Sequence, residues 1–214
     1  MAARLTNEDN CNGASYMVPV HSEPVVRLLQ PMIDREEDQY DHIDLARGKT
    51  LLEVGVGPIA WYSFMSSNRF NDIVLSDLVE DNRKELEKWL NKSEDAIDWT
   101  DRAEQVAALE GYSDVKKGAS DIMERTRSSI RKVVPCNVLE PGVLPEEHRE
   151  TFDVVLSCNC LESATADHES FRSVVNNVGS LVKPGGLFLL GGLGGLESYF
   201  MGSANFIMAN VTED

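Results

Sequence analysis

The sequence of 214 residues predicts an α/β fold built around a doubly wound, mostly parallel sheet. Two observations support this prediction. Short apolar runs that suit buried strands alternate with longer stretches that suit helices. The first apolar run, Thr50 to Val54, leads directly into two closely spaced glycines, an arrangement typical of a parallel strand that turns into a helix. We expect residues 21–214 to form one domain behind a poorly ordered stretch, residues 1–20.

The remaining elements are expected in alternation along the chain. Strands are predicted over residues 50–54, 71–76, 152–157 and 187–190, with a third strand that begins at Val133. Helices are predicted over residues 24–33, 59–65 and 80–90, and from the capping residue Asp167 to Val182. Residues 93–130 are longer than a normal connection between a helix and the next strand. They allow three helical segments, and we expect them to cover the edge of the sheet where the strands end.

Composition excludes several classes of function. The net charge of −16 would repel a phosphate backbone, so nucleic acid is not expected as a partner. No apolar stretch approaches the about 18 residues that span a bilayer, and residues 1–12 lack the apolar core of a secretory signal. The four cysteines and four histidines show no metal-ligand spacing, so no metal is expected. We therefore expect a cytosolic protein with reduced thiols.

The loop after the first strand predicts a binding site for a nucleotide-like cofactor. Gly55 and Gly57 let the backbone turn sharply and approach a ligand, because neither carries a Cβ. Residues 55–60 also satisfy the dinucleotide pattern, so the glycines alone leave a nicotinamide cofactor open. Asp77 ends the second strand and can bind ribose hydroxyls in either cofactor class.

Two features favour S-adenosylmethionine (SAM) as the cofactor. The Glu53 carboxylate could face the positively charged amino-acid end of SAM, and Pro58 is unusual in a pyrophosphate-binding loop. The run from Leu181 to Phe188 ends a helix, turns on Pro-Gly-Gly and enters a strand, which is typical of methyltransferases.

Several longer blocks carry a resemblance to one family. They include Asp72–Asp77, Asn177–Gly186 and Ser198–Gly202, and the most specific are Glu85–Leu90 and Leu181–Gly186. Over roughly residues 48–206 the sequence resembles the nicotinamide, phenylethanolamine and indolethylamine N-methyltransferases. This resemblance implies a Rossmann-like SAM-dependent methyltransferase fold that methylates the nitrogen of a small amine or pyridine-like substrate. Such folds usually finish with another helix and an antiparallel strand pair. We expect only a helix near residues 198–208, so the fifth strand would form an open edge.

The resemblance also implies which residues contact SAM. The glycines would line its methionine end near an aromatic residue, and an aspartate would hold the ribose with an asparagine beside it. Asn137 would contact the adenine amino group between Cys136 and Val138, and Cys158 would lie near the cofactor. These residues are Gly55, Gly57, Trp61, Asp77, Asn82, Cys136, Asn137, Val138 and Cys158.

Glu162 is the candidate residue for binding the substrate. It falls where the phenylethanolamine branch has a glutamate that holds the amine, and its carboxylate could orient an amine and help to remove a proton. Gly192 falls where the nicotinamide branch has an aspartate, Glu197 is out of register, and Tyr16 is a weak candidate for a lid tyrosine. Two alternatives stay open: a non-catalytic relative that binds SAM or a partner protein without turnover, and a nicotinamide oxidoreductase.

Overall fold

The computed structural model describes residues 49–201 and 204–211. The expected N-terminal stretch 1–20, the expected helix 24–33 and Tyr16 lie outside the described residues. Among the described residues, no helix is both long enough and apolar enough to cross a membrane.

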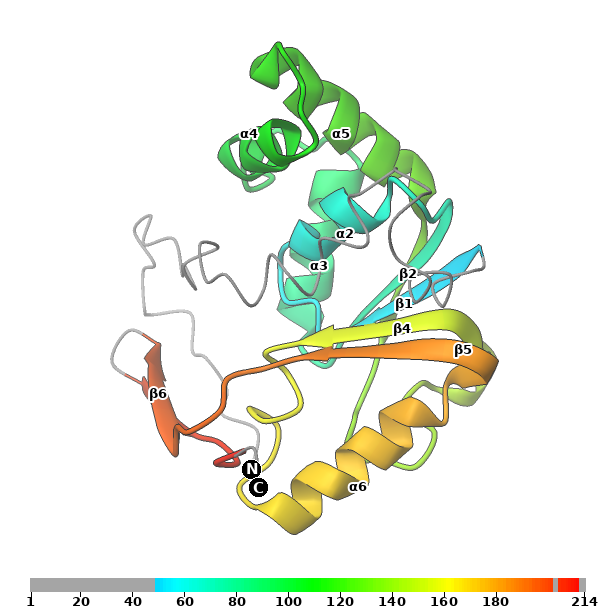
Figure 1. Ribbon diagram of the computed structural model, residues 1–214, viewed down its shortest axis with the longest axis vertical. Helices are drawn as coiled ribbons and strands as arrows, with labels where there is room; N and C mark the ends of the chain where they lie inside the picture. The colour runs from blue at the N-terminus through cyan, green and yellow to red at the C-terminus, as the bar shows by residue number, and fades with distance from the viewer. Residues whose placement is uncertain (1–48, 202–203, 212–214) are drawn as a thin grey trace.

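A parallel sheet of five strands confirms the predicted doubly wound architecture (Figure 1). The strand order is β3-β2-β1-β4-β5, which places the first strand at the centre beside both the second and the fourth. The strands are β1 (Thr50–Val54), β2 (Asp72–Asp77), β3 (Ile130–Pro135), β4 (Phe152–Cys158) and β5 (Val182–Gly191).

Helices cover both faces of the sheet, as Figure 1 shows. They are α2 (Trp61–Ser66), α3 (Glu80–Leu90), α4 (Thr100–Leu109), α5 (Val115–Ser129) and α6 (His168–Gly179), with a short 3-10 turn at Glu146–His148. The first four pack on the face that Leu51 and Ile73 share, and α6 packs on the face of Leu52 and Val74. Adjacent residues of one strand thus enter two different cores, because successive side chains point to opposite faces. This explains why neighbouring residues such as Leu51 and Leu52 in β1, or Ile73 and Val74 in β2, are both apolar.

Several boundaries differ from the prediction. The third strand begins at Ile130, three residues early, because its pairing with β2 extends that far. The helix capped by Asp167 is confirmed, and the Asp167 carboxylate accepts a hydrogen bond from the Ser170 N–H at 2.8 Å, but α6 ends at Gly179. The expected Pro-Gly-Gly turn instead lies inside β5, where the pairing with β4 is irregular. There Gly185 has φ +80°.

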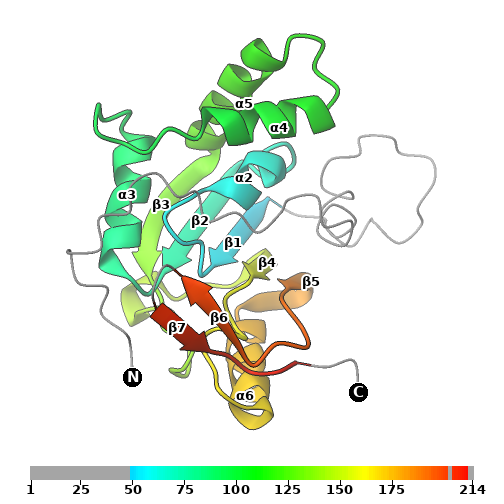
Figure 2. The same cartoon turned by 90° about the vertical axis from the view of Figure 1, so that its left-hand side faces the viewer.

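The expected helix near residues 198–208 is wrong. These residues form an antiparallel pair, β6 (Ser198–Met201) and β7 (Ala204–Ile207), in which the rings of Tyr199 and Phe206 stack 5.1 Å apart. The expectation that no antiparallel pair could form is therefore also wrong. The pair makes a separate two-stranded sheet beyond the carboxyl edge of the main sheet (Figure 2), and within the described chain β5 remains an edge strand.

Residues 93–130 form two helices and not three. The segment 93–97 is a turn, and the helices are α4 and α5. Both pack against α2 through small and branched side chains such as Ala107 and Ile122, so they cover α2 on one face of the sheet. This stretch was predicted to cover the edge where the strands end. In the structure its two helices instead pack against α2, on one face of the sheet.

Candidate functional site

The glycine loop lies at the carboxyl edge of the sheet, between the ends of β1, β2 and β4. Gly55 and Gly57 have φ values of +72° and +70°, a backbone conformation that strains any residue with a Cβ. The Gly55 N–H donates to the Ser76 carbonyl at 2.9 Å. On the other side, a Cβ built on Gly55 would lie 2.1 Å from the Cys160 Sγ atom. The loop is therefore held between β2 and the segment that follows β4, with no room for a side chain at position 55.

Asp77 organises the neighbouring part of this edge. Its Oδ2 atom accepts a hydrogen bond from the Gly57 N–H at 2.8 Å, and its Oδ1 atom accepts from the Val79 N–H at 2.8 Å and the Asn82 Nδ2 atom at 3.0 Å. The structure thus places Asn82 beside Asp77, as expected, and adds Gly57 to them, while contact of these residues with a ligand stays a prediction. A carboxylate has about four lone-pair sites, so three donors leave capacity for one more, such as a hydroxyl.

Glu53 is a buried acid with one free oxygen. Its side chain is 1% exposed, and its Oε2 atom accepts a hydrogen bond from the Ser63 hydroxyl at 2.6 Å. Its Oε1 atom has no hydrogen-bond partner among the described residues. Burial raises the pKa of Glu53 to about 8, against the opposing effect of the Ser63 hydrogen bond. A buried carboxyl with an unsatisfied oxygen suits a cationic group such as an ammonium.

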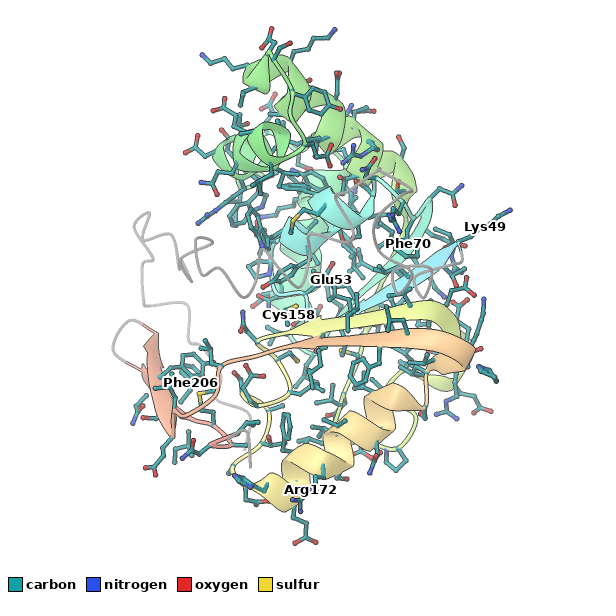
Figure 3. All side chains as sticks on the ribbon, in the orientation of Figure 1. Lys49, Glu53, Phe70, Cys158, Arg172 and Phe206 are labelled. Atoms are coloured by element: carbon teal, nitrogen blue, oxygen red, sulfur yellow. The ribbon has the colours of Figure 1, made fainter. Side chains whose placement is uncertain are left out.

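Cys158 lies close to Glu53, near the end of β4 (Figure 3). Burial, followed by the negative charge of Glu53, raises the pKa of the Cys158 thiol to about 12, so it is a neutral group at physiological pH. Sequence reasoning missed Tyr62 beside it. The Tyr62 hydroxyl accepts a weak hydrogen bond from Asn159 Nδ2 at 3.4 Å. Burial raises the Tyr62 pKa strongly, and the charges of Cys158, Glu53 and Glu162 add to that effect.

Trp61 is a core residue. It begins α2, is 7% exposed and packs in the same cluster as Phe64 and Met65, with the Arg102 guanidinium carbon 5.4 Å from its ring centroid. These contacts are those of a packed core side chain. Contact between Trp61 and a cofactor therefore stays a prediction.

The loop after β3 holds the remaining predicted cofactor residues. The Asn137 Oδ1 atom accepts a hydrogen bond from the Leu139 N–H at 3.1 Å, and the Val138 carbonyl accepts from Asn177 Nδ2 at 3.0 Å. Cys136 is buried, and burial raises the pKa of its thiol to about 11. Leu139 is 55% exposed, an apolar side chain at the same edge as Asp77. The loop thus exposes the apolar side chain of Leu139 at this edge, while contact of Cys136, Asn137 and Val138 with a cofactor stays a prediction.

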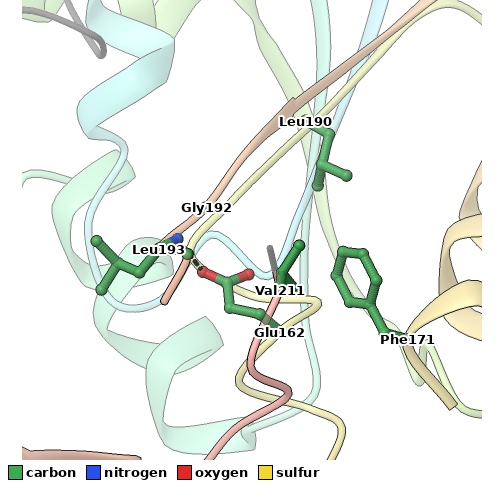
Figure 4. Close-up of a pocket in the computed structure, with 7 residues that line it drawn as sticks. Glu162, Phe171, Leu190, Gly192, Leu193 and Val211 are labelled. Atoms are coloured by element: carbon green, nitrogen blue, oxygen red, sulfur yellow. Dashed lines mark hydrogen bonds between the residues drawn. The ribbon is translucent and has the colours of Figure 1, made fainter. Parts of the chain in front are cut away.

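Glu162 lines a separate hollow of about 190 Å³ (Figure 4). Its side chain is 2% exposed, and its Oε1 atom accepts a hydrogen bond from the Leu193 N–H at 3.0 Å. Its Oε2 atom has no partner among the described residues. Burial raises the pKa of Glu162 against the opposing hydrogen bond of Leu193. Apolar side chains supply most of the remaining wall: Phe171, Leu190, Leu193 and Val211.

The region of the glycine loop and the hollow lined by Glu162 are connected by a short stretch of chain. Cys160, which touches Gly55 in the glycine loop, is two residues from Glu162. Sequence reasoning missed Ser63, Leu193 and Val211. Ser63 and Leu193 matter because they hydrogen-bond buried acids that are distant in sequence, and Val211 matters because it lines the hollow beside Glu162. Within residues 49–201 and 204–211, no group of three or more His, Cys, Asp or Glu side chains could hold a metal ion.

Comparison with known proteins identifies relatives of this chain. A sequence model of the NNMT/PNMT/TEMT family matches residues 39–214, which confirms the resemblance noted from the sequence. The indolethylamine N-methyltransferase of Oryctolagus cuniculus is 34% identical over 165 residues, 75% of this chain and 60% of the relative. The nicotinamide N-methyltransferase of Homo sapiens is 32% identical over 166 residues, 77% of this chain and 61% of the relative.

A third relative has a different named substrate. The phenylethanolamine N-methyltransferase of Homo sapiens is 29% identical over 171 residues, 78% of this chain and 59% of the relative. The chain spans about three-fifths of the length of the curated relatives it matches.

Proposed function

The chain belongs to the NNMT/PNMT/TEMT family, and from this membership we propose that it binds SAM and methylates the nitrogen of a small amine or pyridine-like molecule. When bound, SAM supplies a methyl group that is already activated on a sulfonium. The chain must then bind SAM and the substrate, hold the nitrogen in line with the methyl group, and remove one proton from a protonated amine. Orientation of this kind can supply roughly 7–11 kcal/mol of the barrier reduction.

The carboxyl edge beside β1 fits SAM. Glu53 presents a buried oxygen without a partner among the described residues, which suits the ammonium of the amino-acid end. A Cβ built on Gly57 would meet no atom within 4 Å, so the backbone there borders open space that a ligand could approach closely. Asp77 retains capacity for a ribose hydroxyl, with Asn82 beside it.

Glu162 is the residue that we propose for the substrate nitrogen. A protonated amine has no lone pair, so it must lose one proton before it attacks the methyl carbon. The carboxylate of Glu162 can accept a hydrogen bond from the ammonium through Oε2 and then take up that proton, directly or through water. With the proton removed, the nitrogen lone pair would face the methyl group that SAM would supply, while Glu162 would hold the nitrogen in place.

One observation carries this proposal most directly. Glu162 is nine-tenths or more buried, keeps one oxygen without a partner among the described residues, and is two residues beyond the side chain that touches the glycine loop. A donor ligand at this oxygen removes the cost of burying an unsatisfied acceptor.

The test combines binding with turnover. We expect SAM to bind the wild-type chain in calorimetry, and labelled methyl transfer to at least one member of a panel of amines and pyridines. Binding of SAM without any product from the panel would instead indicate the non-catalytic alternative. Affinity for NADH without affinity for SAM would indicate the oxidoreductase alternative.

A further inference from the structure

Gly192, the residue after β5, lies beside the Glu162 carboxyl group (Figure 4). We propose that Gly192 is a positioning and specificity-determining residue, which places the Glu162 carboxyl so that the hollow accepts a singly charged ammonium group. The naming of an ammonium ligand rests on the proposed function of this hollow, whereas the positioning role rests on the proximity of Gly192 to the carboxyl group.

A side chain at position 192 would meet the whole carboxyl group of Glu162. A Cβ built on Gly192 would lie 3.0 Å from Glu162 Oε1, 3.1 Å from Cδ and 3.1 Å from Oε2. Such distances are tighter than ordinary van der Waals contact, so a side chain at position 192 would push the carboxyl away by a few tenths of an ångström. Gly192 is not among the glycines with positive φ, so the backbone itself accepts an alanine. What the missing side chain provides here is space for Glu162.

Two hydrogen bonds fix Glu162 on this surface. The Leu193 N–H donates to Oε1 at 3.0 Å, and the Glu162 carbonyl accepts from the Ala209 N–H at 2.9 Å. The Glu162 carboxyl group is therefore held by the Leu193 amide next to Gly192, and the Glu162 main chain is held by the segment after β7. Only Oε2 remains for a ligand, as the described part of the chain offers it no donor.

The surrounding wall sets the charge that the hollow accepts. Among the described residues that line it, Glu162 alone is charged, and the others are apolar side chains or glycines. One carboxylate compensates one positive charge, and a second buried charge would remain unpaired at a considerable cost. A ligand without an N–H group would leave Oε2 unsatisfied. The arrangement thus selects a monocation with an N–H donor and an apolar body.

The positioning role has a readout that does not depend on activity. The Leu193 amide chemical shift in NMR reports the hydrogen bond to Glu162. In the wild type we expect this shift to follow the protonation of one carboxyl group as the pH is varied, and Glu162→Gln should abolish that dependence. Gly192→Ala should reduce the dependence to less than half. Gly179→Ala is the matched control, because a Cβ there meets no atom within 4 Å and φ is not positive.

The ligand class is tested with benzylamine and 4-(aminomethyl)benzylamine, which carry one and two ammonium groups at neutral pH. We expect millimolar benzylamine to perturb the Leu193 amide of the wild type, and the diamine to bind about tenfold more weakly or worse. We expect benzylamine to bind Gly192→Ala about tenfold more weakly, through a weakened charge-assisted hydrogen bond.

Each outcome decides one part of the inference. An unchanged Leu193 titration in Gly192→Ala overturns the positioning role. Equal binding of the two amines, or no perturbation by benzylamine, overturns the selectivity. A wild type that shows the expected Leu193 behaviour but binds no SAM would refute the proposed function and leave the positioning role standing.

Discussion

The Asp77 carboxylate accepts a hydrogen bond from the Gly57 N–H at 2.8 Å, so the end of β2 is tied directly to the glycine loop that follows β1. The same carboxylate accepts hydrogen bonds from the Val79 N–H and from Asn82. One side chain thus orders two neighbouring loops without help from a ligand. A loop that is ordered in advance loses less conformational freedom when a ligand binds.

The two loop glycines should respond differently to alanine. Gly57→Ala should cost about 1–2 kcal/mol of stability, because its positive φ strains a Cβ that meets no atom within 4 Å. Gly55→Ala should cost more, about 2–5 kcal/mol, because its Cβ also collides with Cys160. Urea unfolding of both variants measures this difference. Equal losses would show that Cys160 does not pack against Gly55 in solution.

Gly57→Ala also tests the cofactor site. The added methyl group would occupy the space that we assign to SAM, so SAM affinity should fall by at least about tenfold in a variant that remains folded. Calorimetric titration of the folded variant provides the measurement. Affinity equal to that of the wild type would place SAM elsewhere.

Glu53 should make stability depend on pH. Its folded-state pKa is raised from 4.5 to about 8, so over this range the folded chain holds a proton that the unfolded chain releases. This contribution is fully present below the unfolded pKa and is lost as the pH rises through the folded pKa, by up to about 1.4 kcal/mol per pH unit. Urea unfolding across this window should show the decline, and Glu53→Gln should flatten it.

Ser63→Ala provides a matched test of the same carboxyl group. The Ser63 hydroxyl lowers the Glu53 pKa, so its removal should raise that pKa and extend the decline in stability to higher pH. If Glu53→Gln and the wild type lose stability with the same slope, Glu53 is not protonated in the folded chain.

Glu162→Gln should impair methyl transfer while SAM binding stays intact. The amide cannot accept a proton from the substrate ammonium, so kcat/KM for an amine substrate should fall about 100-fold or more. Glu169→Gln, an exposed acid at the start of α6, is the control and should leave kcat/KM unchanged. Loss of SAM affinity in Glu162→Gln would contradict the separation of the two regions.

Local sequence predicted the central part of the fold well. Leu51, Leu52 and Val54 are fully buried, which matches the apolar run that predicted β1. The segments that were predicted incorrectly depend on partners far away in sequence. The Pro-Gly-Gly turn is an irregularity inside β5 because β4 pairs on both sides of it. Residues 198–201 and 204–207 form paired strands in which Tyr199 stacks on Phe206, a contact that a helical spacing of apolar residues does not reveal.

Part of the candidate site was also predictable from the sequence, and part of it was not. Asp77, Asn82 and the loop glycines come together because parallel strands all end at one edge, which the strand assignment alone predicts. The hydrogen-bond partners of Glu53 and Glu162 were not predictable. They are the Ser63 hydroxyl from α2 and the Leu193 amide after β5, and neither contact leaves a motif in the sequence.

Whether SAM binds at the carboxyl edge beside β1 is tested by a SAM titration of the wild type against Asp77→Ala, with Asp72→Ala at the opposite end of the same strand as the control. We predict measurable SAM affinity in the wild type and in Asp72→Ala, and a loss of at least about tenfold in Asp77→Ala. A folded wild type with no affinity for SAM, or equal affinities in the wild type and Asp77→Ala, would contradict the account.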